Sequence, residues 1–188
     1  MTENMDPDMP KLCLPGDRTQ KEKLERMIRV NHAGEYGAVR IYQGQLAVLK
    51  GTPSEAPIKE MANQETRHLE GFERVMSERA VRPTALSPIW HVAGFALGAG
   101  SALLGPKAAM ACTEAIEEVI DGHYAKQVAQ LPEDEKELRN MIEDYREDEV
   151  AHRDIARKEG SREAPGYEIL KSAVKNSSRL AIWLSKRI

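Results

Sequence analysis

Glu65-Thr-Arg-His68 and Glu149-Val-Ala-His152 are two copies of a Glu-x-x-His unit, and each follows another glutamate at nearly the same distance. Glu35 precedes the first unit by 30 positions, and Glu117 precedes the second by 32. Residues three apart in an α-helix share a face, so each unit presents a carboxylate and an imidazole together. The repeat predicts two helical hairpins that bring four carboxylates and two imidazoles to one site.

Most of these groups lie on the core-facing side of their predicted helices. Glu65 and His68 share a face with apolar residues of the same helix: Ile58, Met61, Ala62, Leu69, Phe72 and Val75. Glu35 lies in a similar apolar stripe, as do Glu149 and His152. The apolar stripe of an amphipathic helix faces the core. We therefore expect these five side chains to point inward.

The remaining glutamate belongs to a helix whose inward face is ambiguous. Four acidic residues compete for that face: Glu114, Glu117, Glu118 and Asp121. Glu117 shares its side of the helix with Met110, Ile120 and Tyr124. Because this apolar pattern continues along the helix, we predict Glu117 as the sixth inward group.

Electrostatics favours a metal centre over four bare carboxylates. Burying an unpaired carboxylate costs several kcal/mol, and four close together would repel one another. Two divalent cations would balance the four negative charges. Carboxylate oxygens with one imidazole per metal suit iron or manganese better than zinc or copper. The alternative, that each unit decorates a solvated helix, is common for a single Glu-x-x-His but does not account for the doubled hairpin.

The residue that precedes the glutamate of each unit points about 100° around the helix, toward a neighbouring helix. These residues are Gln64 and Asp148. We hypothesise that Asp148 accepts a hydrogen bond from the free imidazole nitrogen of His68, and that Gln64 does the same for His152. The alternative is that both are polar surface residues.

The chain is predicted to be all-α. Charged residues make up 30% of the sequence and aromatic residues 5%, a balance that favours helix over sheet. A mobile tail at 1–18 precedes one domain at 19–188, which Thr19 and Glu22 open with a capping-box pattern. Breaker residues place helices at about 19–50, 54–80, 86–104, 106–131, 133–159 and 167–187. The predicted fold is a ferritin-like four-helix bundle with an additional apolar helical segment and a C-terminal amphipathic helix.

Composition narrows the classes of partner. The net charge of −3 gives no reason to expect nucleic acid. Cys13 and Cys112 match no zinc or redox spacing, which favours a reduced, cytosolic compartment. Residues 1–20 contain acids and prolines where a signal peptide would have an apolar region, so no targeting peptide is expected.

Residues 86–104 contain no Asp, Glu, Lys or Arg. As a helix this segment would be about 28 Å long, close to the roughly 30 Å hydrocarbon core of a bilayer. Gly94-x-x-x-Gly98 predicts close packing against another helix. Three interpretations stay open: a membrane-embedded or monotopic element, a buried bundle helix, or a full membrane span.

The C-terminal segment at 167–188 is basic and amphipathic. After Glu168 it has no acidic residue and five basic ones, and Trp183 lies among aliphatic neighbours. This pattern predicts an interfacial anchor on anionic lipid. The alternative is a closing helix packed on the bundle.

Several motifs together resemble a known family. The most specific are Arg29-Val-Asn-His-Ala-Gly-Glu-Tyr-Gly-Ala38 and the uncharged segment, which includes Phe95-Ala-Leu-Gly-Ala-Gly100. The others are Arg82-Pro-Thr84, Ala111-Cys-Thr-Glu-Ala-Ile-Glu-Glu118, His123-Tyr124 and Arg179-Leu-Ala-Ile-Trp-Leu-Ser185. From about residue 20 to the C-terminus, the chain resembles the demethoxyubiquinone hydroxylase family of ubiquinone biosynthesis.

The resemblance implies a ferritin-like di-iron monooxygenase at the cytoplasmic face of the cell membrane, peripheral or monotopic. Such an enzyme uses O2 to hydroxylate the ring of a polyprenylated 3-methyl-6-methoxy-1,4-benzoquinol, and partner proteins of the same pathway are expected. Two iron ions would be held at the six positions already selected, with Glu65 and Glu149 bridging them. The electrons would be NADH-linked, although no G-x-G-x-x-G precedes a helix. Tyr36, Tyr42 and Tyr124 would line the pocket or relay electrons, or serve as ordinary core residues.

Two other functions are compatible with parts of the sequence. The first is another di-iron activity, either a ferroxidase or iron-handling protein or a rubrerythrin-type peroxidase. The uncharged segment argues against a cage with a polar exterior, and the Cys-x-x-Cys of a rubredoxin unit is missing. The second is a metal-free helical adaptor or lipid-binding bundle, which leaves the inward carboxylates unexplained.

Overall fold

The computed structural model describes residues 16–188, and in that range every regular element is a helix, with no strand. The elements are α1 (Gln20–Leu49), α2 (Glu55–Glu78), α3 (Ser87–Leu103), α4 (Pro106–Val128), α5 (Lys136–Lys158), the short 3₁₀ helix η1 (Ser161–Glu163) and α6 (Tyr167–Ser185). The all-α prediction is confirmed. Cys13 and most of the predicted tail at 1–18 lie outside the described residues.

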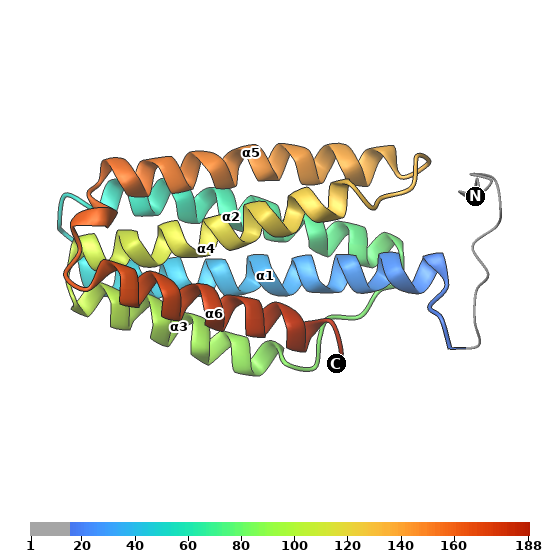
Figure 1. Cartoon of the computed structure of the whole chain (residues 1–188), viewed down its shortest axis with the longest axis horizontal. Helices are drawn as coiled ribbons and strands as arrows, with labels where there is room; N and C mark the ends of the chain where they lie inside the picture. Colours follow the sequence, from blue (N-terminus) through green and yellow to red (C-terminus); the bar gives the residue numbers. More distant parts are fainter. Residues whose placement is uncertain (1–15) are drawn as a thin grey trace, which may run out of the picture.

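Two helical hairpins form the body of the molecule. α1 packs against α2, and α4 packs against α5, as the repeat predicted. Figure 1 shows these four helices running along the long axis of the molecule, with α3 and α6 beside them. α3 packs mainly on α1, and α6 packs mainly on α4.

The helix boundaries follow local signals. The Glu22 amide donates to Thr19 Oγ1 at 3.2 Å, and the Thr19 amide donates to Glu22 Oε2 at 2.7 Å, which confirms the capping box. Gly105 has a φ of 112°, which favours glycine, and Pro106 then begins α4. α5 begins at Lys136, three residues later than the predicted start at residue 133.

α1 and α3 approach closely because glycines line their contact. A Cβ built on Gly98 would lie 1.9 Å from the carbonyl oxygen of Ile41, and one on Gly44 would lie 2.2 Å from that of Phe95. The predicted close packing at Gly94-x-x-x-Gly98 is therefore confirmed. Among residues 16–188, no helix combines the length and apolar character needed to cross a membrane. This finding counts against the full-span interpretation of residues 86–104.

α6 is held at both ends. Near its start, Lys171 and Lys175 each donate to Glu118 of α4 at 2.8 Å. Near its end, Trp90 Nε1 of α3 donates to Ser185 Oγ at 3.0 Å. Leu180 and Trp183 stay exposed on its outer side. α6 thus packs on the bundle, as the closing-helix alternative predicted, and it also presents apolar side chains to solvent.

Candidate metal centre

The structure brings all six predicted ligands together in the middle of the bundle. They come from α1 (Glu35), α2 (Glu65 and His68), α4 (Glu117) and α5 (Glu149 and His152). Each side chain is at most 1% exposed. The predicted inward position is therefore confirmed for Glu117, where the sequence was ambiguous, as well as for the other five residues.

The six side chains divide into two overlapping groups. Glu35 and His68 gather with Glu65 and Glu149, and a ligand atom from each lies within 4.8 Å of the other three. Glu117 and His152 gather with the same two glutamates under the same limit. Glu65 and Glu149 therefore belong to both groups, so each group could hold a cation and the two groups would share two carboxylates.

The inward atoms of this cluster lack hydrogen-bond partners. Eleven buried side-chain atoms in the described residues have none, and eight of them belong to these six residues. They include both oxygens of Glu65 and of Glu149 and the Nδ1 atoms of both histidines. Buried polar atoms are otherwise almost always paired, so this concentration fits atoms directed at a cation.

Several atoms of the cluster lie close together but form no hydrogen bonds with one another. His152 Nδ1 lies 3.0 Å from Glu65 Oε1, and His68 Nδ1 lies 3.3 Å from Glu149 Oε1. A donor set of four carboxylates and two imidazoles suits iron or manganese. The residues present therefore fit a pair of such ions.

Burial and mutual repulsion perturb the carboxyl groups. Burial and the nearby Glu149 raise the pKa of Glu65 well above its usual range, and burial with the same neighbour does so for Glu117. Burial would lower the pKa of His68, but Glu149 and Glu35 outweigh it and raise the pKa to about 10. Without a cation, several of these groups would hold protons at neutral pH.

Each histidine is also held from outside the cluster. His68 Nε2 lies 3.0 Å from Asp148 Oδ2, and His152 Nε2 lies 2.8 Å from Gln64 Oε1. These are the two contacts hypothesised from the sequence. They leave the Nδ1 atom of both rings directed inward.

Two of the three predicted pocket tyrosines contact the cluster. Tyr42 donates to Glu117 Oε1 at 2.7 Å, and Tyr124 donates to Glu35 Oε1. Tyr36 points elsewhere, because its hydroxyl lies 2.6 Å from His91 Nδ1 of α3. The sequence did not distinguish these roles, because they depend on which helix each tyrosine faces.

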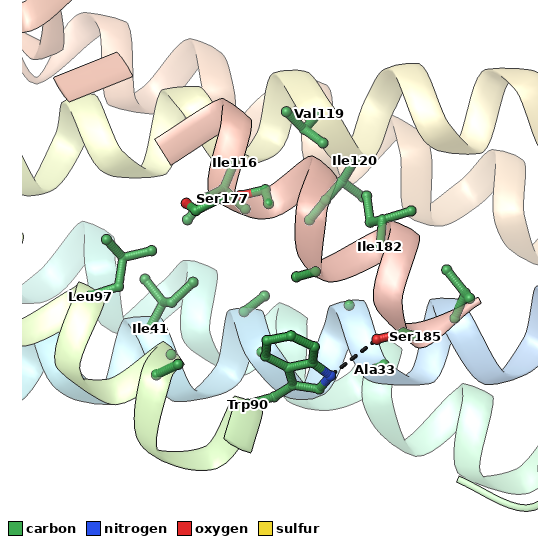
Figure 2. Close-up of a pocket in the computed structure, with 18 residues that line it drawn as sticks. Ala33, Ile41, Trp90, Leu97, Ile116, Val119, Ile120, Ser177, Ile182 and Ser185 are labelled. Atoms are coloured by element: carbon green, nitrogen blue, oxygen red, sulfur yellow. Dashed lines mark hydrogen bonds between the residues drawn. The ribbon is translucent and has the colours of Figure 1, made fainter. Parts of the chain in front are cut away.

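An apolar cavity of about 160 Å³ lies between α1, α3, α4 and α6. Figure 2 shows Ile41, Ile116 and Ile120 around it, with Trp90 reaching across to Ser185. Its wall includes Ala38, one helical turn beyond Glu35, and Ile120, one turn beyond Glu117. The cavity and the carboxylate cluster thus share helices α1 and α4. The cavity could not be located from the sequence, because its walls come from four separate helices.

Residues 22–185 match the family described as ubiquinone biosynthesis protein COQ7. The chain belongs to this family. It is 52% identical over 176 residues to the 3-demethoxyubiquinol 3-hydroxylase of Rhodospirillum rubrum, covering 93% of this chain and 83% of that protein. It is 47% identical over 176 residues to the NADPH-dependent 3-demethoxyubiquinone 3-hydroxylase of Homo sapiens, with 92% and 81% covered. The 5-demethoxyubiquinone hydroxylase of Saccharomyces cerevisiae is 40% identical over 199 residues, with 97% and 85% covered.

The COQ7 match includes every residue of the cluster and both hairpins. It also includes a second buried carboxylate on α4, one of the acidic residues that competed with Glu117 for the inward face. Glu114, one turn before Glu117, is fully buried and accepts hydrogen bonds from Arg157 at 2.8 Å and Lys171 at 3.2 Å. Hydrogen bonds from Ser161 and these cations outweigh burial and hold the pKa of Glu114 at about 2. This group links α4 to α5 and α6 and lies outside the metal centre.

Proposed function

We propose that this COQ7-family protein is a di-iron monooxygenase. It uses O2 to hydroxylate the ring of a polyprenylated 3-methyl-6-methoxy-1,4-benzoquinol, a late step of ubiquinone biosynthesis. The observation that carries the proposal is the buried cluster of six ligand-type side chains with eight unpaired inward atoms. The names of the relatives, which are demethoxyubiquinol or demethoxyubiquinone hydroxylases, support the reaction.

The residues of the cluster would divide between two iron ions. Glu35 and His68 would hold one ion, Glu117 and His152 would hold the other, and both groups share the same two glutamates. When bound, the ions supply the activation of O2 and the oxidising power for ring hydroxylation. The protein would contribute a dry interior, in which the four carboxylates and two imidazoles would hold the ions and balance their charge.

Neighbouring side chains would keep the ligands in place. The phenols of Tyr42 and Tyr124 each hold one oxygen of a glutamate that belongs to one group only. Asp148 and Gln64 hold the outer nitrogens of the two histidines. Ligands fixed in this way need little reorganisation when the ions bind.

The cavity beside the cluster suits the substrate ring. An apolar cavity of about 150 Å³ accommodates one benzene ring, so a volume of about 160 Å³ holds one substituted six-membered ring but not a long isoprenoid tail. The tail would have to extend between α3 and α6 toward the surface. Exposed apolar side chains lie on those two helices: Ile89, Val92, Leu103, Ile169, Leu180 and Trp183.

This apolar surface supports a peripheral or monotopic position at the cytoplasmic face of the cell membrane. Lys171 and Lys175 are paired with Glu118, so the other three basic residues of the C-terminal segment, Arg179, Lys186 and Arg187, would add attraction to anionic lipid. Binding to anionic vesicles should then weaken as salt is added. If the protein does not bind these vesicles at any salt concentration, this part of the proposal is overturned.

The electrons for the reaction would come from an NADH-linked donor. Several relatives are named NADPH-dependent.

A hydroxylation assay tests the proposed reaction. Iron-reconstituted protein is incubated with NADH, 18O2 and a demethoxy-quinol carrying a short isoprenoid tail. The expected product carries one labelled oxygen atom on the ring, and Glu149→Gln should form none. Iron oxidation without a hydroxylated product would instead indicate the ferroxidase alternative, and peroxide consumption would indicate the rubrerythrin-type alternative.

A further inference from the structure

The two histidines of the cluster occupy matching places in the repeat but have chemically different outer partners. His68 meets the carboxylate of Asp148 at 3.0 Å. His152 meets the amide oxygen of Gln64 at 2.8 Å. One ring is therefore paired with an anion and the other with a neutral group.

The orientation of these groups follows from their chemistry. A carboxylate can only accept, so His68 must donate through Nε2. The Gln64 amide nitrogen lies 3.5 Å from Asp148 Oδ1, a long contact that directs the amide oxygen toward His152. His152 thus donates to Gln64, and Gln64 donates to Asp148. The four groups form one chain that contains a single negative charge.

The remaining ligands of the two positions are closely matched. Glu35 serves one position and accepts from Tyr124, while Glu117 serves the other and accepts from Tyr42. The two other glutamates are common to both groups. The carboxylate count at each position is therefore equal, and the outer partner of the histidine is the clearest chemical difference between them.

Arg67 partly offsets the negative charge that Asp148 places beside His68. Its guanidinium donates to Asp148 Oδ2 at 2.9 Å. The Arg67 side chain is 62% exposed, and ion pairs of such exposed groups are weak. Asp148 therefore keeps most of its effect on the ring of His68.

We propose that Asp148 and Gln64 make the two metal positions inequivalent. A divalent cation enters the position at Glu35 and His68 first, and it is held there more tightly than a cation at Glu117 and His152. The physical reason is that a carboxylate partner makes an imidazole a stronger donor to a metal than an amide partner does. This inference rests on the proposed two-metal centre.

Anaerobic titration of the metal-free chain with Co²⁺, followed by its visible absorption, tests the proposal. Two steps alone would not decide it, because a first cation also repels a second. A matched pair of ligand variants decides it. Glu117→Gln should leave the dissociation constant of the first ion nearly unchanged, whereas Glu35→Gln should raise it about tenfold or more. Equal effects of the two variants would overturn the proposal.

Exchanging the outer partners provides the second arm. In the variant Gln64→Glu with Asp148→Asn, the anion faces His152 instead, and both changes preserve side-chain size. The responses to Glu35→Gln and Glu117→Gln should then be reversed, and unchanged responses would contradict the proposal. Circular dichroism of each variant confirms folding, and if the exchanged chain does not fold, the first pair of variants still decides the question.

The same titration separates this inference from the proposed function. If the chain binds two Co²⁺ ions and the two ligand variants change the dissociation constant of the first ion equally, the positions are equivalent and the two-metal centre still stands. Binding of one ion or none would refute both.

Discussion

The phenol of Tyr42 on α1 donates a 2.7 Å hydrogen bond to Glu117 on α4, across the interior of the bundle. This contact links the first hairpin to the second directly at the candidate metal centre. It also explains how Glu117 tolerates burial, because one of its oxygens has a buried donor while the other is free to face a cation.

Replacing Tyr42 by Phe should leave a buried oxygen of Glu117 unpaired. We expect the free energy of unfolding of the metal-free chain to fall by about 1–3 kcal/mol, measured by urea denaturation. Affinity for Mn²⁺ should fall about tenfold. Tyr36→Phe is the matched control, since its hydroxyl bonds to His91 away from the cluster, and it should leave Mn²⁺ affinity unchanged. Equal losses of affinity in the two variants would contradict the assigned role of Tyr42.

The stability of the metal-free chain should decrease as pH rises above about 5. Burial and neighbouring charges raise the folded-state pKa of Glu65 and Glu117, so the stability they contribute is present below the unfolded pKa and is lost as pH rises through the folded pKa. Glu114 behaves oppositely, because its pKa of about 2 means that its contribution is lost only as pH falls toward that value.

Metal ions should reverse this pH dependence, since they replace protons on the cluster. Thermal unfolding with and without Mn²⁺ at about pH 5.5 and about pH 8 measures the effect. We expect the rise in Tm caused by Mn²⁺ to be larger at the higher pH. A constant or shrinking rise would mean that the carboxyl groups do not exchange protons for metal.

Two glycines of α3 should respond oppositely to the same substitution. A Cβ at Gly98 would meet the backbone of Ile41, so Gly98→Ala should destabilise the chain by about 1–3 kcal/mol or more. A Cβ at Gly100 meets nothing within 4 Å, so Gly100→Ala should stabilise the chain by about 0.5–1 kcal/mol. Urea denaturation measures both values. Similar effects at the two positions would show that α3 does not pack on α1 as described.

Filling the apolar cavity should impair hydroxylation without affecting the metal centre. Ala181 of α6 lines the cavity, whereas Ala173 is exposed on the same helix. We expect Ala181→Phe to lower hydroxylation of the quinol about tenfold or more. Iron content should stay at the wild-type value, and Ala173→Phe should behave as wild type. Full activity of Ala181→Phe would mean that the ring binds elsewhere.

The helices and the six inward-facing side chains of the cluster could be predicted from the sequence because helical periodicity links spacing directly to faces, although Glu117 had acidic competitors on its helix. Glu65 and His68 share an apolar stripe within one helix, so no knowledge of neighbouring helices was needed. The pairing of helices into two hairpins followed from the repeated spacing of a glutamate and a Glu-x-x-His unit. Breaker residues also placed the helix boundaries to within about three residues.

The features that the sequence did not reveal depend on contacts between helices. Glu114 and Glu117 are both buried, and what separates them is that Arg157 and Lys171 from α5 and α6 neutralise the first. The roles of Tyr42 and Tyr124, and the cavity beneath α6, likewise arise from packing of distant segments. Such contacts leave no periodic signal within a single helix.

We propose that the doubled hairpin builds one centre for two metal ions. The most direct test is the iron content of the chain after anaerobic reconstitution and removal of loose metal. We expect two iron ions per chain, and fewer than two in Glu149→Gln, because this glutamate belongs to both groups of ligands. One iron ion or none in the wild-type chain, or two retained by Glu149→Gln, would mean that the hairpins do not form this two-metal centre.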